Sequence, residues 1–165
     1  MAALGSLLPD VSLYLMAGVS LFLLRIPPER VFGELYFSNS WQSVFAVDNS
    51  FLVWGIVLLV AVLMRSMPAV ALSCAGLLHI ASDFALHNDD ARPHFWPLSD
   101  WVFESPISYW DSQHHAGLVA PFTLIVGLIS AFVILRRWKD LRVRFAVLTV
   151  CCLEVWVVRQ WLLFF

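Results

Sequence analysis

Charged residues are scarce in this sequence. Lysine, arginine, aspartate and glutamate together make up 13% of its 165 residues, against about a quarter in soluble domains. Hydrophobic residues make up 61%, and the mean hydropathy is +0.81. A surface of this composition aggregates in water unless lipid covers it. The composition therefore excludes an ordinary soluble domain and predicts an integral membrane protein.

Cysteine is rare as well, and it is absent from the polar part of the chain. Cys74, Cys151 and Cys152 all lie within apolar runs. The adjacent Cys151 and Cys152 side chains point in different directions on a helix, so we expect all three thiols to pack as small hydrophobes. A structural zinc–cysteine site is excluded. The sequence also lacks a signal-peptide pattern, an internal repeat and a second domain.

Five apolar runs are candidates for membrane spans, which need about 20 residues each. They cover residues 11–24 with a lead-in at 2–8, 50–64, 68–86, 118–135 and 143–165. Pro9 and Asp10 fall inside the first, where a proline interrupts helical hydrogen bonding. Asp48 and Asn49 resemble a cap for the second. The predicted fold is all-α, a polytopic transmembrane helix bundle of about five spans in one domain covering residues 1–165.

Basic residues predict the orientation, because lysine and arginine near span ends concentrate on the cytoplasmic side. The loop between the fourth and fifth runs contains Arg136, Arg137, Lys139, Arg142 and Arg144. With that loop in the cytoplasm, Arg65 is also inside, and residues 25–49 and 87–117 are outside. We therefore expect a multi-pass protein of the bacterial inner membrane with a histidine-rich loop, residues 87–117, on the periplasmic side.

The polar side chains gather in residues 79–117. This stretch holds all five histidines, which are His79, His87, His94, His114 and His115. It also holds six of the twelve carboxylates: Asp83, Asp89, Asp90, Asp100, Glu104 and Asp111. Because nearly everything else is apolar, the sequence predicts one polar site.

A stripe on one helix face forms the predicted centre of that site. His79, Asp83 and His87 are spaced i, i+4 and i+8, so they follow one face. One ion can be held by His79 and Asp83 together, as in helical zinc motifs with the same spacing. His87 lies about 12 Å along the helix from His79, so it serves a second ion or the same site from a loosened helix end. An unpaired Asp83 carboxylate in an apolar helix is costly, which predicts a partner for it.

Imidazole and carboxylate ligands suit a divalent metal, with zinc or manganese the expected ions. Asp90 and His94 are further candidate ligands in the stretch. Asp111, His114 and His115 are candidates to complete the ions or to act as acid and base. The mixture is more typical of hydrolytic two-metal sites, which activate a water and clamp a phosphoryl or carbonyl oxygen, than of structural sites.

Two sets of residues carry a resemblance to a known family. Leu7-Leu8-Pro9-Asp10, followed by apolar helices and the HxxxD pattern of His79 and Asp83, resembles the YdjM-type family of bacterial inner-membrane metal-dependent hydrolases. The blocks IPPERVFGELYFSNSWQSVFAVDNSF and HNDDARPHFWPLSDWVFESPISYWDSQHH look like alphaproteobacterial membrane proteins of that kind, over roughly residues 7–120. The HxxxD helix is also similar to one in zinc-dependent phospholipase C and P1-type nucleases.

This resemblance implies a helical membrane hydrolase in which Asp10, His79 and Asp83 are metal ligands, supported by His87 and the later histidines. The first and third spans run in the same direction in the predicted topology. If both were straight, Asp10 and His79 would differ in height by about 10 Å or more. Either the first span is broken or shifted, or Asp10 is not a ligand.

The leading hypothesis is a membrane-bound metal-dependent hydrolase that acts on a phosphate or ester group, in a lipid-derived substrate, at the periplasmic membrane surface. The alternative is a non-catalytic accessory or assembly subunit of a larger membrane complex, favoured by the compact set of spans and the many outward aromatic residues. A transporter is a third option, although the polar residues gather at one face instead of lining a path through the membrane. No feature predicts nucleic-acid binding.

Overall fold

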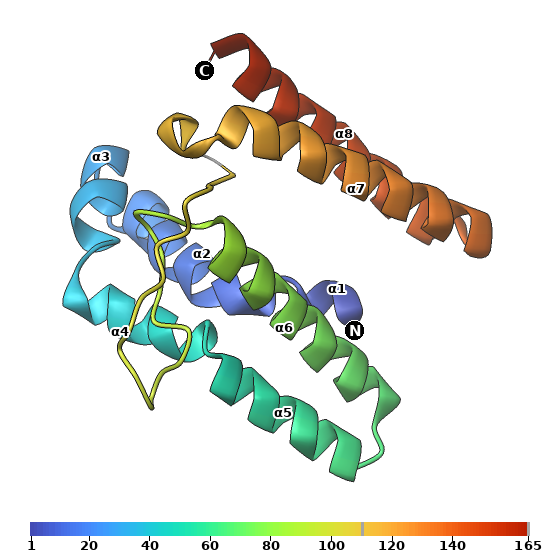
Figure 1. The fold of residues 1–165 in the computed structure, drawn as a ribbon, viewed down its shortest axis with the longest axis horizontal. Helices are drawn as coiled ribbons and strands as arrows, with labels where there is room; N and C mark the ends of the chain where they lie inside the picture. The colour runs from blue at the N-terminus through green and yellow to red at the C-terminus, as the bar shows by residue number, and fades with distance from the viewer. Residues whose placement is uncertain (110, 165) are drawn as a thin grey trace. The chain divides into compact units, whose positions relative to one another are not determined.

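The computed structural model describes residues 1–109 and 111–164, with side chains described up to residue 160. Every regular element in that part of the chain is helical (Figure 1), which confirms the all-α prediction. Four segments are long and apolar enough to cross a membrane: Ala2–Leu23, Asn39–Leu63, Met67–Leu86 and Ala116–Arg137. They overlap the first four predicted spans, although the second begins at Asn39 and not near residue 50. The protein is therefore a multi-pass membrane protein. Helix α8 (Leu141–Phe164) is the candidate for a fifth span, and it contains Arg142, Arg144, Glu154 and Arg159.

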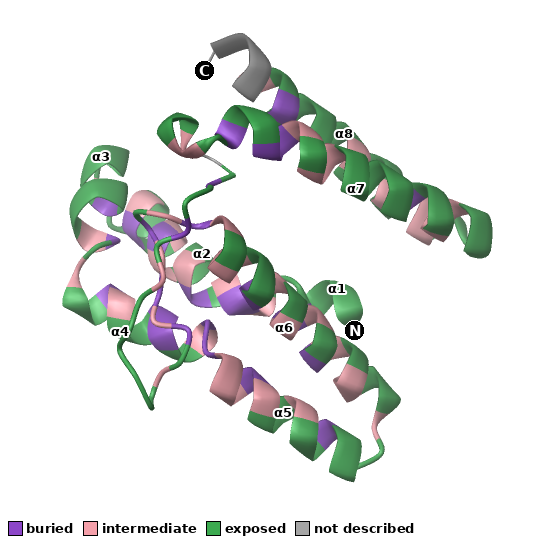
Figure 2. Ribbon diagram, in the orientation of Figure 1, coloured by how far each residue is buried: buried purple, intermediate pink, exposed green. Residues whose placement is uncertain are grey.

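The described residues pack into two compact units. The first comprises Met1–Ala85 and Asp89–Ser105, and the second comprises Leu86–Asn88 and Pro106–Phe165. The sequence predicted one membrane domain over residues 1–165, and this single domain stays a prediction. In both units many helix residues are exposed (Figure 2), and large apolar side chains are among them, including Phe22, Leu63 and Phe145 with exposed fractions of 80%, 72% and 75%. Lipid must cover this surface.

The first span is interrupted, as the proline predicted. Helix α1 (Ala2–Gly5) is followed by a 3₁₀ turn at Leu8–Asp10, and helix α2 (Val11–Gly18) then continues into a π-helical turn at Val19–Leu23. Pro9 is fully buried within the 3₁₀ turn. Because proline has no backbone N–H, the α-helical ladder cannot continue unchanged through this point.

Close backbone approaches fix two helices against α6 (Met67–Leu86). A Cβ atom added to Gly5 would overlap the backbone of Leu72, and one added to Gly76 would overlap the ring of Trp54 in α5 (Phe51–Leu63). Helices α1 and α5 therefore both contact α6 at positions where a side chain larger than hydrogen cannot fit. The contact of Gly5 with Leu72 sets the register of the first span against the third, and that of Gly76 with Trp54 sets the second against the third.

Residues 28–48, between the first span and α5, are mostly helical. Helix α3 (Pro28–Arg30) leads into a π-helical turn at Val31–Leu35, and α4 (Asn39–Asp48) follows. The buried side chains of this region pack together with α2 in one hydrophobic cluster: Ala17, Val31, Tyr36, Trp41 and Phe45.

The junction between α4 and α5 corrects one prediction and anchors the loop that follows α6. Ser50, and not Asp48 or Asn49, caps α5, because its hydroxyl accepts from the backbone N–H groups of Leu52 and Val53. The Asn49 carbonyl instead accepts a hydrogen bond at 2.9 Å from Nδ1 of His94. The Asn49 side chain donates to the Pro9 carbonyl at 3.1 Å. This junction thus connects the break in the first span to the loop.

The second unit consists mainly of a helical hairpin. Helix α7 (Ala116–Arg137) and α8 run alongside each other, joined by residues 138–140 (Figure 1). A 3₁₀ turn at Ser112–His114 precedes α7, and His115 caps α7 in a left-handed conformation with φ 67°.

Candidate metal centre

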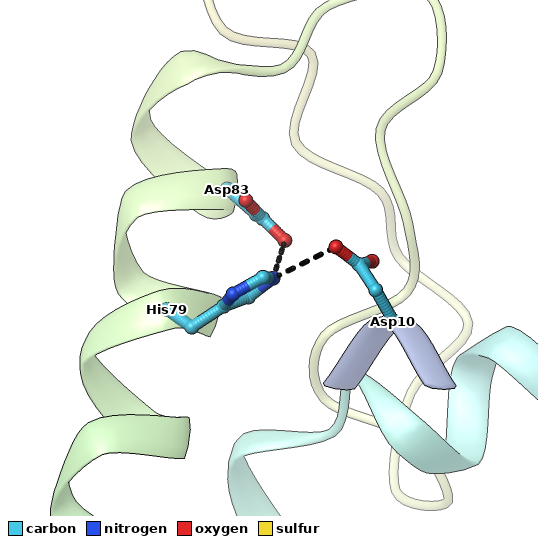
Figure 3. A group of neighbouring side chains, drawn as sticks. All are labelled: Asp10, His79 and Asp83. Carbon is cyan, nitrogen blue, oxygen red and sulfur yellow. Dashed lines mark ion pairs between the residues drawn. The ribbon is translucent and has the colours of Figure 1, made fainter. Parts of the chain in front are cut away.

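Asp10, His79 and Asp83 converge in the first unit (Figure 3). Nε2 of His79 lies 3.0 Å from Oδ2 of Asp83 and 3.5 Å from Oδ2 of Asp10. One ligand atom from each residue lies within 4.8 Å of the other two. Nitrogen and oxygen ligands of a single zinc ion are separated by about 3.4 Å, since each bond is about 2.1 Å long. The spacing is therefore close to that of side chains that share one ion.

Two elements supply the three side chains. His79 and Asp83 are one helical turn apart on the same face of α6, as their spacing predicted. Asp10 is the last residue of the 3₁₀ turn that breaks the first span. Because Gly5 packs on Leu72, the first span begins beside that residue instead of beside the first turn of α6. The height difference between Asp10 and His79 expected for two straight spans is therefore absent, because the first span is both broken and shifted.

The imidazole of His79 is oriented by the backbone of the first span. Nδ1 lies 2.8 Å from the carbonyl oxygen of Ser6. A carbonyl oxygen can only accept a hydrogen bond, so Nδ1 carries a proton and donates it. In the neutral ring, Nε2 then holds a lone pair that faces two carboxylate oxygens. Within the described part of the chain, this buried Nε2 makes no hydrogen bond of good geometry.

The Asp10 carboxylate has different partners on its two oxygens. Oδ2, which faces His79, also accepts a hydrogen bond from the Tyr14 hydroxyl at 3.4 Å. Oδ1 accepts from Nη1 of Arg92 at 3.4 Å. The Asp10, His79 and Asp83 side chains are 16–19% exposed. The group is thus largely desolvated but not sealed, which leaves access for a small ligand.

The other predicted ligands lie outside this group. His94 is 2% exposed, and its ring packs against Phe51 and Phe84 while Nδ1 bonds to Asn49. Asp90 is also buried, in the loop next to Arg92. His87 belongs to the second unit, where its ring contacts Tyr109 edge to face. The described residues contain one group of three ligand-type side chains, so the geometry gives no support to a two-metal arrangement there.

The three predicted acid–base residues lie in the second unit. Nδ1 of His114 is 2.6 Å from Oδ2 of Asp111, and the backbone N–H of Gln113 donates to Oδ1 of Asp111 at 2.8 Å. The hydrogen bond from His114, followed by the one from Gln113, lowers the pKa of the Asp111 carboxyl below its ordinary value. His115 is exposed. A carboxylate that orients an imidazole is one component of an acid–base pair, and that role stays a prediction.

Sequence reasoning missed Ser6, Tyr14 and Arg92 as neighbours of the group, and Tyr36 as the second partner of Arg92. Ser6 contributes through its carbonyl group, so its residue type carried no signal. Arg92 did leave a signal, since it is the single basic residue between His79 and Gly117. A lone arginine among six carboxylates indicates an ion pair with one of them. The distant Asp10 was not a predictable partner, because loop contacts follow no periodicity.

Comparison of the chain with protein-family models, with curated proteins and with solved structures found no match. The functional reading therefore depends on the side-chain chemistry of Asp10, His79 and Asp83.

Proposed function

We propose that Asp10, His79 and Asp83 hold one divalent metal ion, zinc or manganese, in a membrane-bound hydrolase. Its substrate carries a phosphate or ester group and derives from lipid. The resemblance of Leu7-Leu8-Pro9-Asp10 and of the HxxxD pattern to the YdjM-type hydrolases implies the same three ligands. In this proposal the site faces the periplasmic side of a bacterial inner membrane.

The observation that carries the proposal is the arrangement around His79. Its Nδ1–H donates to a backbone carbonyl while Nε2 faces two carboxylate oxygens. Metal-binding histidines commonly donate the second ring N–H in this way, which fixes the tautomer and the ring orientation. A neutral imidazole lone pair directed at two anionic oxygens is repulsive, and a cation among the three atoms turns that repulsion into attraction.

Three protein ligands suit a catalytic site better than a structural one, because a fourth position is left for water or substrate. A bound ion supplies Lewis acidity, which lowers the pKa of a coordinated water and polarises a phosphoryl or carbonyl oxygen. The chain's own residues hold and orient the ligands: Ser6 directs the imidazole, and Tyr14 donates to the Asp10 oxygen on the ligand side.

The depth of the group supports a lipid-derived substrate. Asp83 lies three residues before the last residue of α6, which is about 5 Å along the helix axis. The positive-inside pattern of residues 136–144 assigns that end of α6 to the periplasmic side. A site at this depth meets the head groups of the outer leaflet.

A metal-reconstitution assay tests the hydrolase. The protein, in lipid nanodiscs, is stripped with a chelator and reloaded with Zn²⁺ or Mn²⁺. It is then offered a phosphomonoester, a phosphodiester and a carboxyl ester of p-nitrophenol, together with vesicles of phosphatidic acid. We expect metal-dependent hydrolysis of at least one substrate in the wild type and in Asp89→Asn, whose exposed carboxylate lies outside the group. Asp83→Asn should hydrolyse these substrates no faster than the background rate without protein. Metal-loaded wild type with no more activity than Asp83→Asn would contradict the proposal.

The alternative, an accessory subunit without catalysis, has one observation in its favour. A doubly protonated His79 together with Arg92 would balance the charges of Asp10 and Asp83, and the four side chains would then form a structural ion network. In that case the purified protein binds no metal, and it copurifies with a larger complex.

A further inference from the structure

Arg92 is buried on the side of Asp10 that faces away from His79. Its side chain is 5% exposed. Nη1 donates to Oδ1 of Asp10 at 3.4 Å, and Nη2 donates to the Tyr36 hydroxyl at 3.3 Å. The guanidinium carbon lies 4.8 Å from the centre of the Phe45 ring. Side chains from positions 10, 36 and 45, all far from Arg92 in sequence, thus surround one cationic group.

We propose that Arg92 is the positioning residue of the metal centre, which it serves by holding the Asp10 carboxylate so that Oδ2 faces the ion. This inference rests on the proposed metal site. Arg92 has no lone pair available for a cation, so it acts through Asp10 and is not itself a ligand.

The geometry of Asp10 requires an anchor of this kind. Its carboxylate lies on a 3₁₀ turn and not on α6, so no helical repeat fixes its direction toward His79. The bond to Arg92 occupies Oδ1 and leaves Oδ2 facing Nε2 of His79 at 3.5 Å. Carboxylate ligands of metals are commonly oriented by a second hydrogen bond of this type. Without it, the bond from the Tyr14 hydroxyl to Oδ2 is the other described hydrogen bond that restrains the carboxylate.

Charge and shape both favour arginine at this position. An arginine side chain keeps its charge even when it is buried, and here that charge lies 3.4 Å from Oδ1 of Asp10. Burial raises the pKa of Tyr36, so its neutral hydroxyl accepts from Arg92. A planar guanidinium reaches two partners at fixed angles while its face stacks on an aromatic ring, and a lysine ammonium does not reproduce that combination.

The test is the affinity for Zn²⁺, measured by competition with a chromogenic chelator on the full-length protein in nanodiscs. Arg92→Gln, which removes the charge, should weaken binding by about 10–100-fold, as loss of an outer-shell partner does. Arg92→Lys should recover part of that loss because it restores the charge. Tyr36→Phe removes one hydroxyl and should weaken binding less than Arg92→Gln. Arg30→Gln is the matched control, since Arg30 pairs with Glu34 on the exposed surface, and it should bind as the wild type does.

A double variant separates positioning from a general loss of structure. If Arg92 acts through Asp10, the double variant Arg92→Gln with Asp10→Asn should bind Zn²⁺ with an affinity within about twofold of that of Asp10→Asn alone. The contact between Arg92 and the Asp10 carboxylate is already lost in Asp10→Asn. A further drop in the double variant, or wild-type affinity in Arg92→Gln, overturns the positioning role while leaving the metal site standing. Failure of the wild type itself to bind Zn²⁺ overturns the metal site and, with it, this inference.

Discussion

At the residue scale, the two ring nitrogens of His79 divide the centre into a protein side and an ion side. Nδ1 is committed to the Ser6 carbonyl, and Nε2 is directed at Asp10 and Asp83. The same division applies to Asp10, whose Oδ1 contacts Arg92 while Oδ2 faces His79. In His79 and in Asp10, one polar atom is thus bound by the protein, and another faces the place between the three side chains that an ion would occupy.

Asn49 is the residue that we expect to hold the backbone next to Asp10. Its side chain is fully buried and donates to the carbonyl groups of Pro9 and Phe45 at 3.1 and 3.0 Å. Asn49→Ala leaves these buried carbonyl groups with fewer partners, which costs about 1–3 kcal/mol. We predict a lower unfolding temperature in detergent for Asn49→Ala. Ser43→Ala removes only a hydroxyl that bonds within an exposed helical turn, and it should unfold with the wild type. Equal unfolding temperatures for both variants and the wild type would show that Asn49 has no such role.

At the element scale, the break in the first span brings Asp10 to α6. Pro9 ends the regular ladder, and the contact between Gly5 and Leu72 sets where α1 meets α6. The two features have separate consequences. The break at Pro9 turns Asp10 toward α6, and the contact of Gly5 with Leu72 fixes the position along α6 that Asp10 reaches.

We predict that Gly5→Ala weakens metal binding as well as stability. The added Cβ would overlap backbone atoms of Leu72, which cannot move aside as a flexible side chain can, so α1 must shift away from α6. Gly18→Ala is the matched control because a Cβ at Gly18 meets nothing within 4 Å; alanine there should preserve or raise stability. Both properties are measured by thermal unfolding with and without added Zn²⁺. If Gly5→Ala keeps the full metal-induced rise in unfolding temperature, the register of α1 does not control the site.

Periodicity explains which parts of the site were predictable. The i, i+4 spacing of His79 and Asp83 placed both on one face of α6, and the structure has them there. Pro9 indicated the break in the first span. Asp10 entered through a resemblance, because its meeting with α6 depends on the packing of Gly5 and not on any local pattern. The loop residues were unpredictable for the same reason: His94 bonds to Asn49, 45 positions away, and Arg92 bonds to Asp10, 82 positions away.

At the scale of the whole molecule, apolar surface and basic residues define the relation to the membrane. Four helical segments meet the length and hydropathy of spans, and their exposed apolar side chains need lipid. In the orientation that we propose, the basic cluster at residues 136–144 lies in the cytoplasm. The loop between α6 and α7 then lies on the periplasmic side, in the proposed topology.

The position of the C-terminus tests that topology and the fifth span together. If α8 crosses the membrane, an odd number of spans separates the two ends of this chain, and the C-terminus lies in the periplasm. We predict that alkaline phosphatase fused after Phe165 is active and that a fused green fluorescent protein is dark. Fusions at residue 139, in the basic loop, should give the reverse pattern. A fluorescent fusion after Phe165 would mean that α8 stays on the cytoplasmic side.

The central claim is that one ion is shared by Asp10, His79 and Asp83, and elemental analysis of the purified protein tests it most directly. Protein isolated in mild detergent and equilibrated with Zn²⁺ or Mn²⁺ should retain about one ion per chain after gel filtration. His79→Ala, Asp83→Asn and Asp10→Asn should each lose it, whereas His114→Ala, in the second unit, should keep it. A metal-free wild type, or an ion that persists in all three ligand variants, would contradict the account.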